Sequence, residues 1–296
     1  MDILQAVILG IVEGITEYLP ISSTGHLIVT QRLMGIGFHG EKQAADAFAI
    51  CIQGGAIAAV LGLYFNHVWQ MLLGLLGKSP SGLKMLLNLV VAFLPAAVSA
   101  LTLEKVIKSH LFGIHPIVSA WFVGGIIILV FCHRSKKNPR PENVKTLADL
   151  TWRMALMIGL LQCVAMWPGT SRSLMTIAAG ILVGLRTKDA VEFSFLLGVL
   201  TLSAATAKDA MEFGPMMLNV FGPAKLLAGF AAAAISAAFA VKWLVAYLQK
   251  NGMQVFGWYR IAVALVVAIL VGNGVIKDAP APAAIPQPPT RSTGEG

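Results

Sequence analysis

The sequence is poor in charged residues, and this sets the first limit on its fold. Only 12% of its 296 residues are Asp, Glu, Lys or Arg, whereas a typical soluble domain has about 25%. So few charges cannot cover a surface that faces water on all sides. The chain is 57% hydrophobic with a mean hydropathy of +0.77, so lipid is the expected solvent for much of it.

Cysteine is scarce as well, and a basic leader is missing. Cys51, Cys132 and Cys163 fall in or beside apolar segments at spacings that match no metal site, so we expect small buried side chains rather than disulfides. The start at Met1 shows neither a basic region nor a cleavage site, and no removable signal peptide is expected. The net charge of +8 comes mostly from residues that flank apolar runs. It therefore indicates topology and contact with anionic membrane lipids, and no nucleic acid partner.

Long apolar runs are what the sequence does contain. A helix needs about 20 residues to cross roughly 30 Å of hydrocarbon, and the runs are too continuous for alternating barrel strands. They predict an all-α polytopic membrane protein, with Trp69, Trp121, Trp152 and Trp258 as interfacial anchors near the span ends. The runs cover residues 45–65, 86–103, 117–131, 190–207, 226–248 and 260–276.

Two parts of the chain resemble each other. Residues 6–10 (AVILG) and 155–159 (ALMIG) each precede a polar loop, LPISSTGH at 19–26 and WPGTSRS at 167–173. In both parts the expected helices around the loop are short, at 3–18 and 27–34 and at 154–166 and 174–185. Such half-length pieces are typical of inverted repeats that enclose a mid-membrane site.

We therefore predict an inverted repeat in which each copy is a re-entrant helix-loop-helix followed by about three transmembrane helices. The basic connector between the copies should be cytoplasmic, so the first pair enters from outside and the second from the cytoplasm. The loop tips then meet inside the membrane, where irregular backbone needs protein or a wet cavity around it. The predicted units are residues 1–135 (first repeat), 136–150 (connector), 151–277 (second repeat) and 278–296 (a disordered Pro/Ala-rich tail).

Two carboxylates lie in the first short helix. Glu13 and Glu17 stack on one helix face, which they share with Gly10 and Gly14, residues that let another backbone approach. Ionisable groups inside a membrane are costly and usually functional. Such a pair suits a hard divalent cation or acid–base chemistry, although a wet helix end would also hold two carboxylates.

The first loop carries hydroxyls and a histidine. Pro20 should end the incoming helix, and Ser22 or Ser23 can cap the outgoing one, where an anion is favoured. The hydroxyls are interpreted as phosphate ligands, one of them a nucleophile activated by His26. A plain capped turn with a structural histidine is the alternative.

The second loop places Arg172 among hydroxyls between two apolar half-helices. An arginine at this depth needs an anionic partner, and its planar fork suits a phosphate. A structural salt bridge to Glu13 or Glu17 is the alternative, and it is compatible with a ligand-free state. Further polar residues that can line the same cavity are Gln53, Gln162, Asp46, Glu192 and Thr176.

Both motifs resemble those of the bacterial undecaprenyl-diphosphatases of the bacitracin-resistance type. The first is Glu-x-x-x-Glu leading into Ser-Ser-Thr-Gly-His, here Glu13 to His26; the second is Pro-Gly-x-Ser-Arg-Ser-x-x-Thr, here Pro168 to Thr176. The resemblance covers Leu4 to about Gly272. One departure is Leu174, where many members have glycine, and it affects the tightness of the turn.

The resemblance implies an enzyme that hydrolyses undecaprenyl diphosphate to undecaprenyl phosphate and phosphate, recycling the carrier for peptidoglycan synthesis and conferring bacitracin resistance. It implies a multi-pass protein of the inner membrane, with the site reached from the periplasmic face and a homodimer as a possible assembly. Glu13 and Glu17 then take the metal (Mg²⁺ or Ca²⁺) and acid–base roles. Ser23 is the candidate nucleophile, His26 the proton shuttle and Arg172 the phosphate clamp. The substrate-binding residues implied are Ser22, Thr24, Gly25, Gly169, Ser171, Ser173 and Thr176.

Two other functions are weighed against this one. A transporter or flippase for a lipid phosphate would also use broken inverted repeats, but it needs no nucleophile beside a proton shuttle. Another membrane lipid-phosphatase family pairs Ser-Gly-His with a distant Ser-Arg-x5-His-x3-Asp, and no histidine follows Ser171-Arg172 at that spacing. The residues alone leave open a covalent serine intermediate or direct attack by water.

Overall fold

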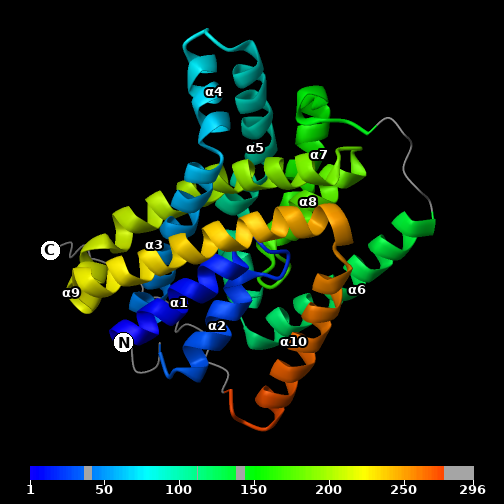
Figure 1. The fold of residues 1–296 in the computed structure, drawn as a ribbon. Helices are drawn as coiled ribbons and strands as arrows, with labels where there is room; N and C mark the ends of the chain where they lie inside the picture. The colour runs from blue at the N-terminus through cyan, green and yellow to red at the C-terminus, as the bar shows by residue number, and fades with distance from the viewer. Residues whose placement is uncertain (37–41, 112, 138–143, 277–296) are drawn as a thin grey trace, which may run out of the picture.

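A computed structural model describes residues 1–36, 42–111, 113–137 and 144–276, and the chain is helical through most of this range (Figure 1). Side chains are described for fewer residues than the backbone, and that of Asp46 is outside this set. The helices are α1 (Ile3–Thr16), α2 (Ser23–Leu33), α3 (Lys42–Leu63), α4 (Phe65–Leu75), α5 (Pro80–Leu111), α6 (Ile114–Lys137), α7 (Trp152–Gln162), α8 (Arg172–Leu182), α9 (Thr187–Asn251) and α10 (Gln254–Gly272), with 3₁₀ turns η1 (Leu147–Asp149) and η2 (Cys163–Met166).

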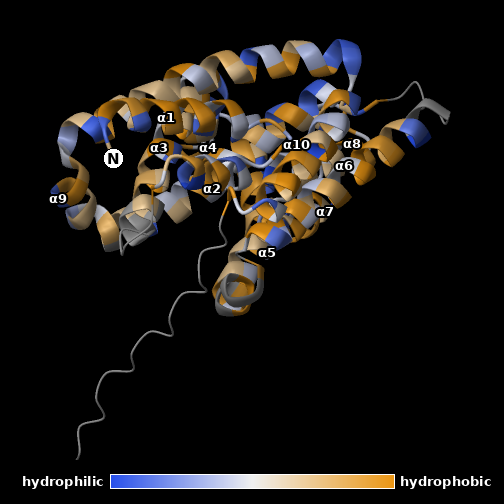
Figure 2. Cartoon of the chain, turned by 90° about the horizontal axis from the view of Figure 1, so that it is seen from below, coloured by the Kyte–Doolittle hydropathy of each residue, from blue (hydrophilic) through white to orange (hydrophobic). Residues whose placement is uncertain are grey.

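The long helices match the predicted spans. Within the described residues, five segments are long and apolar enough to cross a membrane: Pro80–Leu103, Ile114–Arg134, Thr187–Lys208, Phe213–Asn251 and Gln254–Gly272. The bent pair α3–α4 makes a sixth if it is one span. Hydrophobic residues prevail along most of these helices (Figure 2), and many of the large ones are exposed, as lipid contact requires. The prediction of an all-α polytopic membrane protein is confirmed.

Three details differ from the sequence-based expectation. The run at 45–65 is a single helix only to Leu63, after which α4 turns away by 80° and forms a hairpin with α5. The spans expected at 190–207 and 226–248 are joined in α9, which kinks at Gly222 (φ 72°) just before Pro223. Trp121 is no interfacial anchor: it is buried, and its indole N–H donates to the Ile21 carbonyl at 2.8 Å.

The short helices around the two loops are present as predicted, with slightly different bounds. The 14 residues of α1 span about 21 Å, too little to cross roughly 30 Å of hydrocarbon. Helix α1 ends at Thr16, before Pro20, and α2 starts at Ser23; α7 and η2 end at Met166, and α8 starts at Arg172. The loop after α1 and the loop before α8 lie side by side near the middle of the molecule (Figure 1).

Corresponding residues of the two copies have corresponding surroundings. A Cβ on Gly10 would lie 2.3 Å from the Gly229 carbonyl oxygen in α9, and one on Gly159 would lie 2.3 Å from the Ala92 carbonyl oxygen in α5. Each short helix therefore packs closely on a long helix from the other half of the chain. An offset of 149 residues relates Gly10 to Gly159, and the same offset relates Ser22 to Ser171, the described non-glycine residues with positive φ, at 73° and 74°. The inverted orientation and the unit boundaries stay predictions.

The end of the connector is tied to the second copy. Lys145 and Leu185 form an isolated parallel bridge, in which Lys145 N donates to the Gly184 carbonyl (3.0 Å). The backbone N–H of Leu147 donates to the buried Asp189 carboxylate (2.9 Å). Residues 138–143 of the connector and the tail 278–296 lie outside the described residues. The three cysteines are free thiols and half-buried.

Candidate active site

The first loop presents Ser23 at the start of α2. Helix α1 stops one residue before Glu17, whose backbone N–H still donates to the Glu13 carbonyl (2.9 Å). Ser22 then adopts the left-handed region, unusual for a residue with a side chain, and reverses the chain into α2. It is the N-cap residue, but its side chain makes no capping hydrogen bond, so the predicted capping role of this hydroxyl is wrong.

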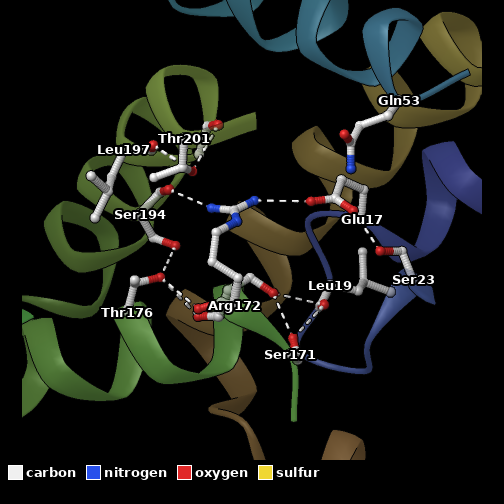
Figure 3. Close-up of polar contacts among 12 residues, drawn as sticks. Glu17, Leu19, Ser23, Gln53, Ser171, Arg172, Thr176, Ser194, Leu197 and Thr201 are labelled. Atoms are coloured by element: carbon white, nitrogen blue, oxygen red, sulfur yellow. Dashed lines mark hydrogen bonds and ion pairs between the residues drawn. The ribbon is translucent and has the colours of Figure 1, made fainter. Parts of the chain in front are cut away.

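Glu17 joins the two loops. Its Oε2 accepts a hydrogen bond from the Ser23 hydroxyl at 2.5 Å, and its Oε1 lies 3.2 Å from Arg172 Nη2 (Figure 3). Glu17 and Ser23 are both buried, and the Arg172 side chain is only 12% exposed. The structure thus brings together three predicted residues from motifs 155 positions apart. The salt bridge that was the alternative interpretation of Arg172 exists, and it is made to the group that also binds the Ser23 hydroxyl.

The guanidinium of Arg172 is held from several sides. Nη1 donates to the Ser194 carbonyl in α9 at 3.0 Å, and Cζ lies 5.6 Å from the centroid of the Tyr18 ring, within cation–π range. A Cβ on Gly198 would lie 2.3 Å from Nη1 and 2.6 Å from Cζ, so only glycine leaves room for this group. The Nε atom is buried and has no hydrogen-bond partner among the described residues.

Glu13 lies one turn before Glu17 and faces the same region. Its carboxylate is buried and interacts electrostatically with Glu17 and Arg172, yet neither oxygen has a hydrogen-bond partner among the described residues. A buried, unpaired carboxylate is costly, so a proton or a bound cation would stabilise this group. Carboxylate oxygens are the ligands that Mg²⁺ and Ca²⁺ prefer.

The donor set fits such a cation in part. The described residues contain no cluster of three or more His, Cys, Asp or Glu side chains that could hold a metal ion, so Glu13 and Glu17 would supply two carboxylate ligands. This matches the usual coordination of Mg²⁺, in which one or two carboxylates, several waters and phosphate oxygens are the ligands. The residues therefore fit a cation that is completed by water and a phosphorylated ligand.

The hydroxyls of the second loop bind protein. Ser173 Oγ donates to the Leu19 carbonyl at 2.8 Å, and Ser171 Oγ lies 3.0 Å from Ser173 Oγ. Thr176 donates to the Arg172 carbonyl (2.9 Å) and lies 2.6 Å from the Ser194 hydroxyl. In this arrangement they join the loops and support the arginine, whereas the sequence predicted them as ligands of the substrate.

His26 is not placed beside Ser23 Oγ as a base would be. Its Nδ1 lies 2.7 Å from the Ser22 carbonyl and its Nε2 2.9 Å from the Tyr259 hydroxyl, so the observed partner of Ser23 is Glu17. Both ring nitrogens of His26 thus have other partners in this structure, and its role in activating the serine stays a prediction.

The other predicted positions divide into exposed and packed residues. Thr24 is exposed at the first turn of α2. A Cβ on Gly25 would lie 2.4 Å from the Trp121 ring, and Gly169 has φ 98°, a conformation that favours glycine. Both glycines thus allow close packing of the loops against α6.

The weaker cavity candidates have mixed positions. Gln53 points towards Glu17 (Figure 3) while its Oε1 accepts from Thr206 (3.1 Å). Gln162 is buried with neither amide atom paired among the described residues. Glu192 forms an ion pair with Lys188 at 3.8 Å.

Sequence reasoning missed several residues that complete the site. Tyr18, Ser194 and Gly198 surround Arg172, and no pattern in the sequence marks them because their spacing to Arg172 is set by the fold. Arg260 was detectable: it is a charged residue at the start of an apolar run, and such residues are usually functional.

Comparison with known proteins adds a family to this geometry. The model of the family described as "Bacitracin resistance protein BacA" matches residues 6–266. A Rhodospirillum rubrum protein named undecaprenyl-diphosphatase 2 is 42% identical over 93% of this chain and 97% of its own length. The undecaprenyl-diphosphatase of Methylococcus capsulatus is also 42% identical, with the same coverage. That of Sorangium cellulosum is 40% identical over 89% of this chain and 84% of its own length.

Proposed function

Because this chain belongs to the family of the bacitracin resistance protein BacA, we propose that it hydrolyses undecaprenyl diphosphate to undecaprenyl phosphate and phosphate. The relatives at about 40% identity are named undecaprenyl-diphosphatase. The observation that carries the proposal is the contact chain from the Ser23 hydroxyl through Glu17 to the Arg172 guanidinium, buried among apolar helices. It combines a candidate nucleophile, a proton acceptor and a fixed positive charge.

The chemistry follows from this contact chain. Ser23 Oγ attacks the terminal phosphorus, Glu17 Oε2 takes the hydroxyl proton, and the bond from phosphorus to the bridging oxygen breaks so that the lipid monophosphate leaves. Water then hydrolyses the phosphoserine; alternatively, a water near Ser23 attacks directly with the same proton acceptor. A base at hydrogen-bond distance contributes typically 10²–10⁴-fold, and alignment and charge neutralisation supply most of the rest in phosphoryl transfer.

Arg172 can bind the substrate while it keeps its position beside Ser194. Its Nε is unpaired, and Nη2 can exchange the Glu17 oxygen for a phosphate oxygen while Nη1 stays on the Ser194 carbonyl. This exchange also frees the Glu17 carboxylate to accept a proton. Arginine forks match phosphate oxygens bidentately, so ligand binding and activation of the base would occur together.

A divalent cation, Mg²⁺ or Ca²⁺, is part of the proposal. With both carboxyl groups ionised, Glu13 and Glu17 would outweigh the single positive charge of Arg172, and this local excess of negative charge would repel a diphosphate. Glu13, with two unpaired oxygens, and Glu17 would hold the cation. When bound, it would neutralise charge on the phosphate oxygens.

The membrane setting suits an amphipathic substrate. The anionic head would reach the buried site while the isoprenoid tail stays in lipid beside the exposed apolar helix faces. We place the protein in the bacterial inner membrane, with the site reached from the periplasmic face, where it returns the carrier lipid to peptidoglycan synthesis and confers bacitracin resistance. His26 as a proton shuttle and a homodimeric assembly stay predictions.

The test is phosphate release from a C55 diphosphate by the purified protein in lipid, with and without a chelator. We expect release that stops with EDTA, returns with Mg²⁺ or Ca²⁺, and falls at least about 100-fold in Arg172→Met. Binding of the lipid without release of phosphate would favour a transporter. Full activity of Arg172→Met, or of the chelated enzyme, would contradict the arginine or the metal assignment respectively.

A further inference from the structure

Arg260 in α10 is a fully buried arginine outside the contact chain described above. Its guanidinium forms no ion pair with a carboxylate of the described residues and instead donates to five backbone carbonyl groups. A buried charge is retained only where dipoles or partners replace its hydration. Five backbone carbonyl groups therefore replace the hydration of this one side chain.

Those carbonyl groups belong to both loops and to α6. Nη1 donates to Pro20 of the first loop (3.3 Å) and to Thr170 of the second (3.2 Å), and Nη2 donates to Gly169 (2.7 Å). The remaining bonds go to Ala120 (2.9 Å) and Trp121 (3.4 Å) in α6. One rigid, planar group thus fixes two irregular segments against each other.

The anchored residues lie next to the reacting groups in the chain. Pro20 precedes Ser23 by three residues, and Thr170 precedes Arg172 by two. The Ser23 and Arg172 side chains both contact Glu17, at 2.5 Å and 3.2 Å. A displacement of one loop relative to the other would therefore change the separation of Arg172 from both Glu17 and Ser23, and a misplacement of about 1 Å can cost 10²-fold in rate.

A glycine makes room for the arginine. A Cβ on Gly124 of α6 would lie 2.3 Å from Arg260 Nη2 and 2.8 Å from Cζ. The guanidinium of Arg172 packs against Gly198 in the same way. Each of these arginines thus lies against a helix at a point where any side chain would displace it.

We propose that Arg260 is a positioning residue, which locks the two loops in register so that Ser23 and Arg172 meet at Glu17. It acts through the loop backbones and does not touch the substrate. The activity part of the test rests on the proposed phosphatase function, whereas the exchange part does not.

The first experiment measures C55-diphosphate hydrolysis by Arg260→Met and Arg260→Lys, with Arg153→Met as the matched control. Arg153 is exposed and lies over the Trp152 ring, so its variant should keep wild-type activity. We expect kcat to fall at least 30-fold in Arg260→Met with KM changed less than threefold, and to be partly restored in Arg260→Lys, which keeps N–H donors.

A double-mutant cycle separates positioning from loss of folded protein. In an Arg172→Met background, Arg260→Met should cost less than threefold more, because the alignment that it maintains has already lost one partner. Equal fold-losses in both backgrounds would overturn the proposal, since a smaller active fraction multiplies every rate alike.

The second experiment does not use activity. Hydrogen–deuterium exchange of Arg260→Met should be at least tenfold faster than wild type in peptides covering 17–26 and 166–175, and unchanged in 80–103. Gly124→Ala should reproduce this pattern, and Gly62→Ala, at an exposed site with nothing within 4 Å of its Cβ, should not. Unchanged exchange in both loops, or acceleration in every peptide, would refute the role. If the wild type releases no phosphate, the proposed function fails and this exchange result still decides the role of Arg260.

Discussion

Substituting Glu17 by glutamine tests the contact chain at its centre. The amide has nearly the same shape, so packing is kept while the negative charge is lost. Ser23 and Arg172 now donate to different oxygens of Glu17. The amide has one oxygen for these two donors, and its NH₂ group, which is itself a donor, occupies the place of the second oxygen. The variant therefore removes the proton acceptor of Ser23 and the counter-charge of Arg172 in one step.

The expected magnitudes follow from the burial of these groups. Removal of a general base at 2.5 Å from the nucleophile should lower kcat by about 10²–10⁴-fold. The Arg172–Glu17 pair is shielded, at 12% and 6% side-chain exposure, so weakening one partner should cost about 1–3 kcal/mol of unfolding free energy. A complete break of a buried pair would cost about 3–5 kcal/mol, and the surviving amide oxygen keeps the loss below that.

Phosphate release and thermal unfolding in the same lipid preparation measure both effects. Glu192→Gln is the matched control, because Glu192 lies outside the contact chain and pairs with Lys188 at 3.8 Å, whose side chain is 54% exposed. This variant should retain wild-type kcat. The reasoning would be refuted if Glu17→Gln kept more than about a tenth of the wild-type kcat, or if the control lost as much.

Three further outcomes are expected. Ser23→Ala should lower phosphate release at least about 100-fold, whereas Thr24→Ala, at an exposed position, should stay within threefold. Gly198→Ala should lower kcat about tenfold or more, since its Cβ would lie 2.3 Å from the Arg172 guanidinium. Gly62→Ala should leave kcat unchanged in the same assay. At Asp149, hydrogen bonds from a neighbouring threonine hold the pKa below its ordinary value of 3.8. This contribution is present above the unfolded pKa and is lost as the pH falls, so the melting temperature should drop below about pH 4, and less so in Asp149→Asn.

The parts of the fold that follow from local pattern were predictable. Apolar runs of about 20 residues identify spans because lipid leaves helices few alternatives. The two loops were located by polar residues between apolar half-helices, and the closeness of Glu17 to Arg172 followed from the internal resemblance of the two halves. These inferences succeed because each depends on composition within one segment, or on symmetry between two segments.

What escaped prediction depends on tertiary contact. The apolar run at 45–65 gave no sign of the 80° bend between α3 and α4, because Tyr64 and Phe65 suit a continuing helix equally well. Trp121 has the residue type of an interfacial anchor but is buried against the first loop. The contact of Ser23 with Glu17, made through a turn at Ser22, was not anticipated beside the predicted role of His26.

The offset of 149 residues also relates Ser23 to Arg172, so the candidate nucleophile and the candidate phosphate clamp occupy matching positions in the two loop regions. Each is the first residue of the outgoing helix, directly after a serine in the left-handed region. Identical side chains at both positions would put two hydroxyls or two guanidinium groups at one centre, and neither pair could both attack and neutralise a phosphate. The shared backbone brings the two positions together, and it is the divergence of their side chains that makes the centre chemically competent.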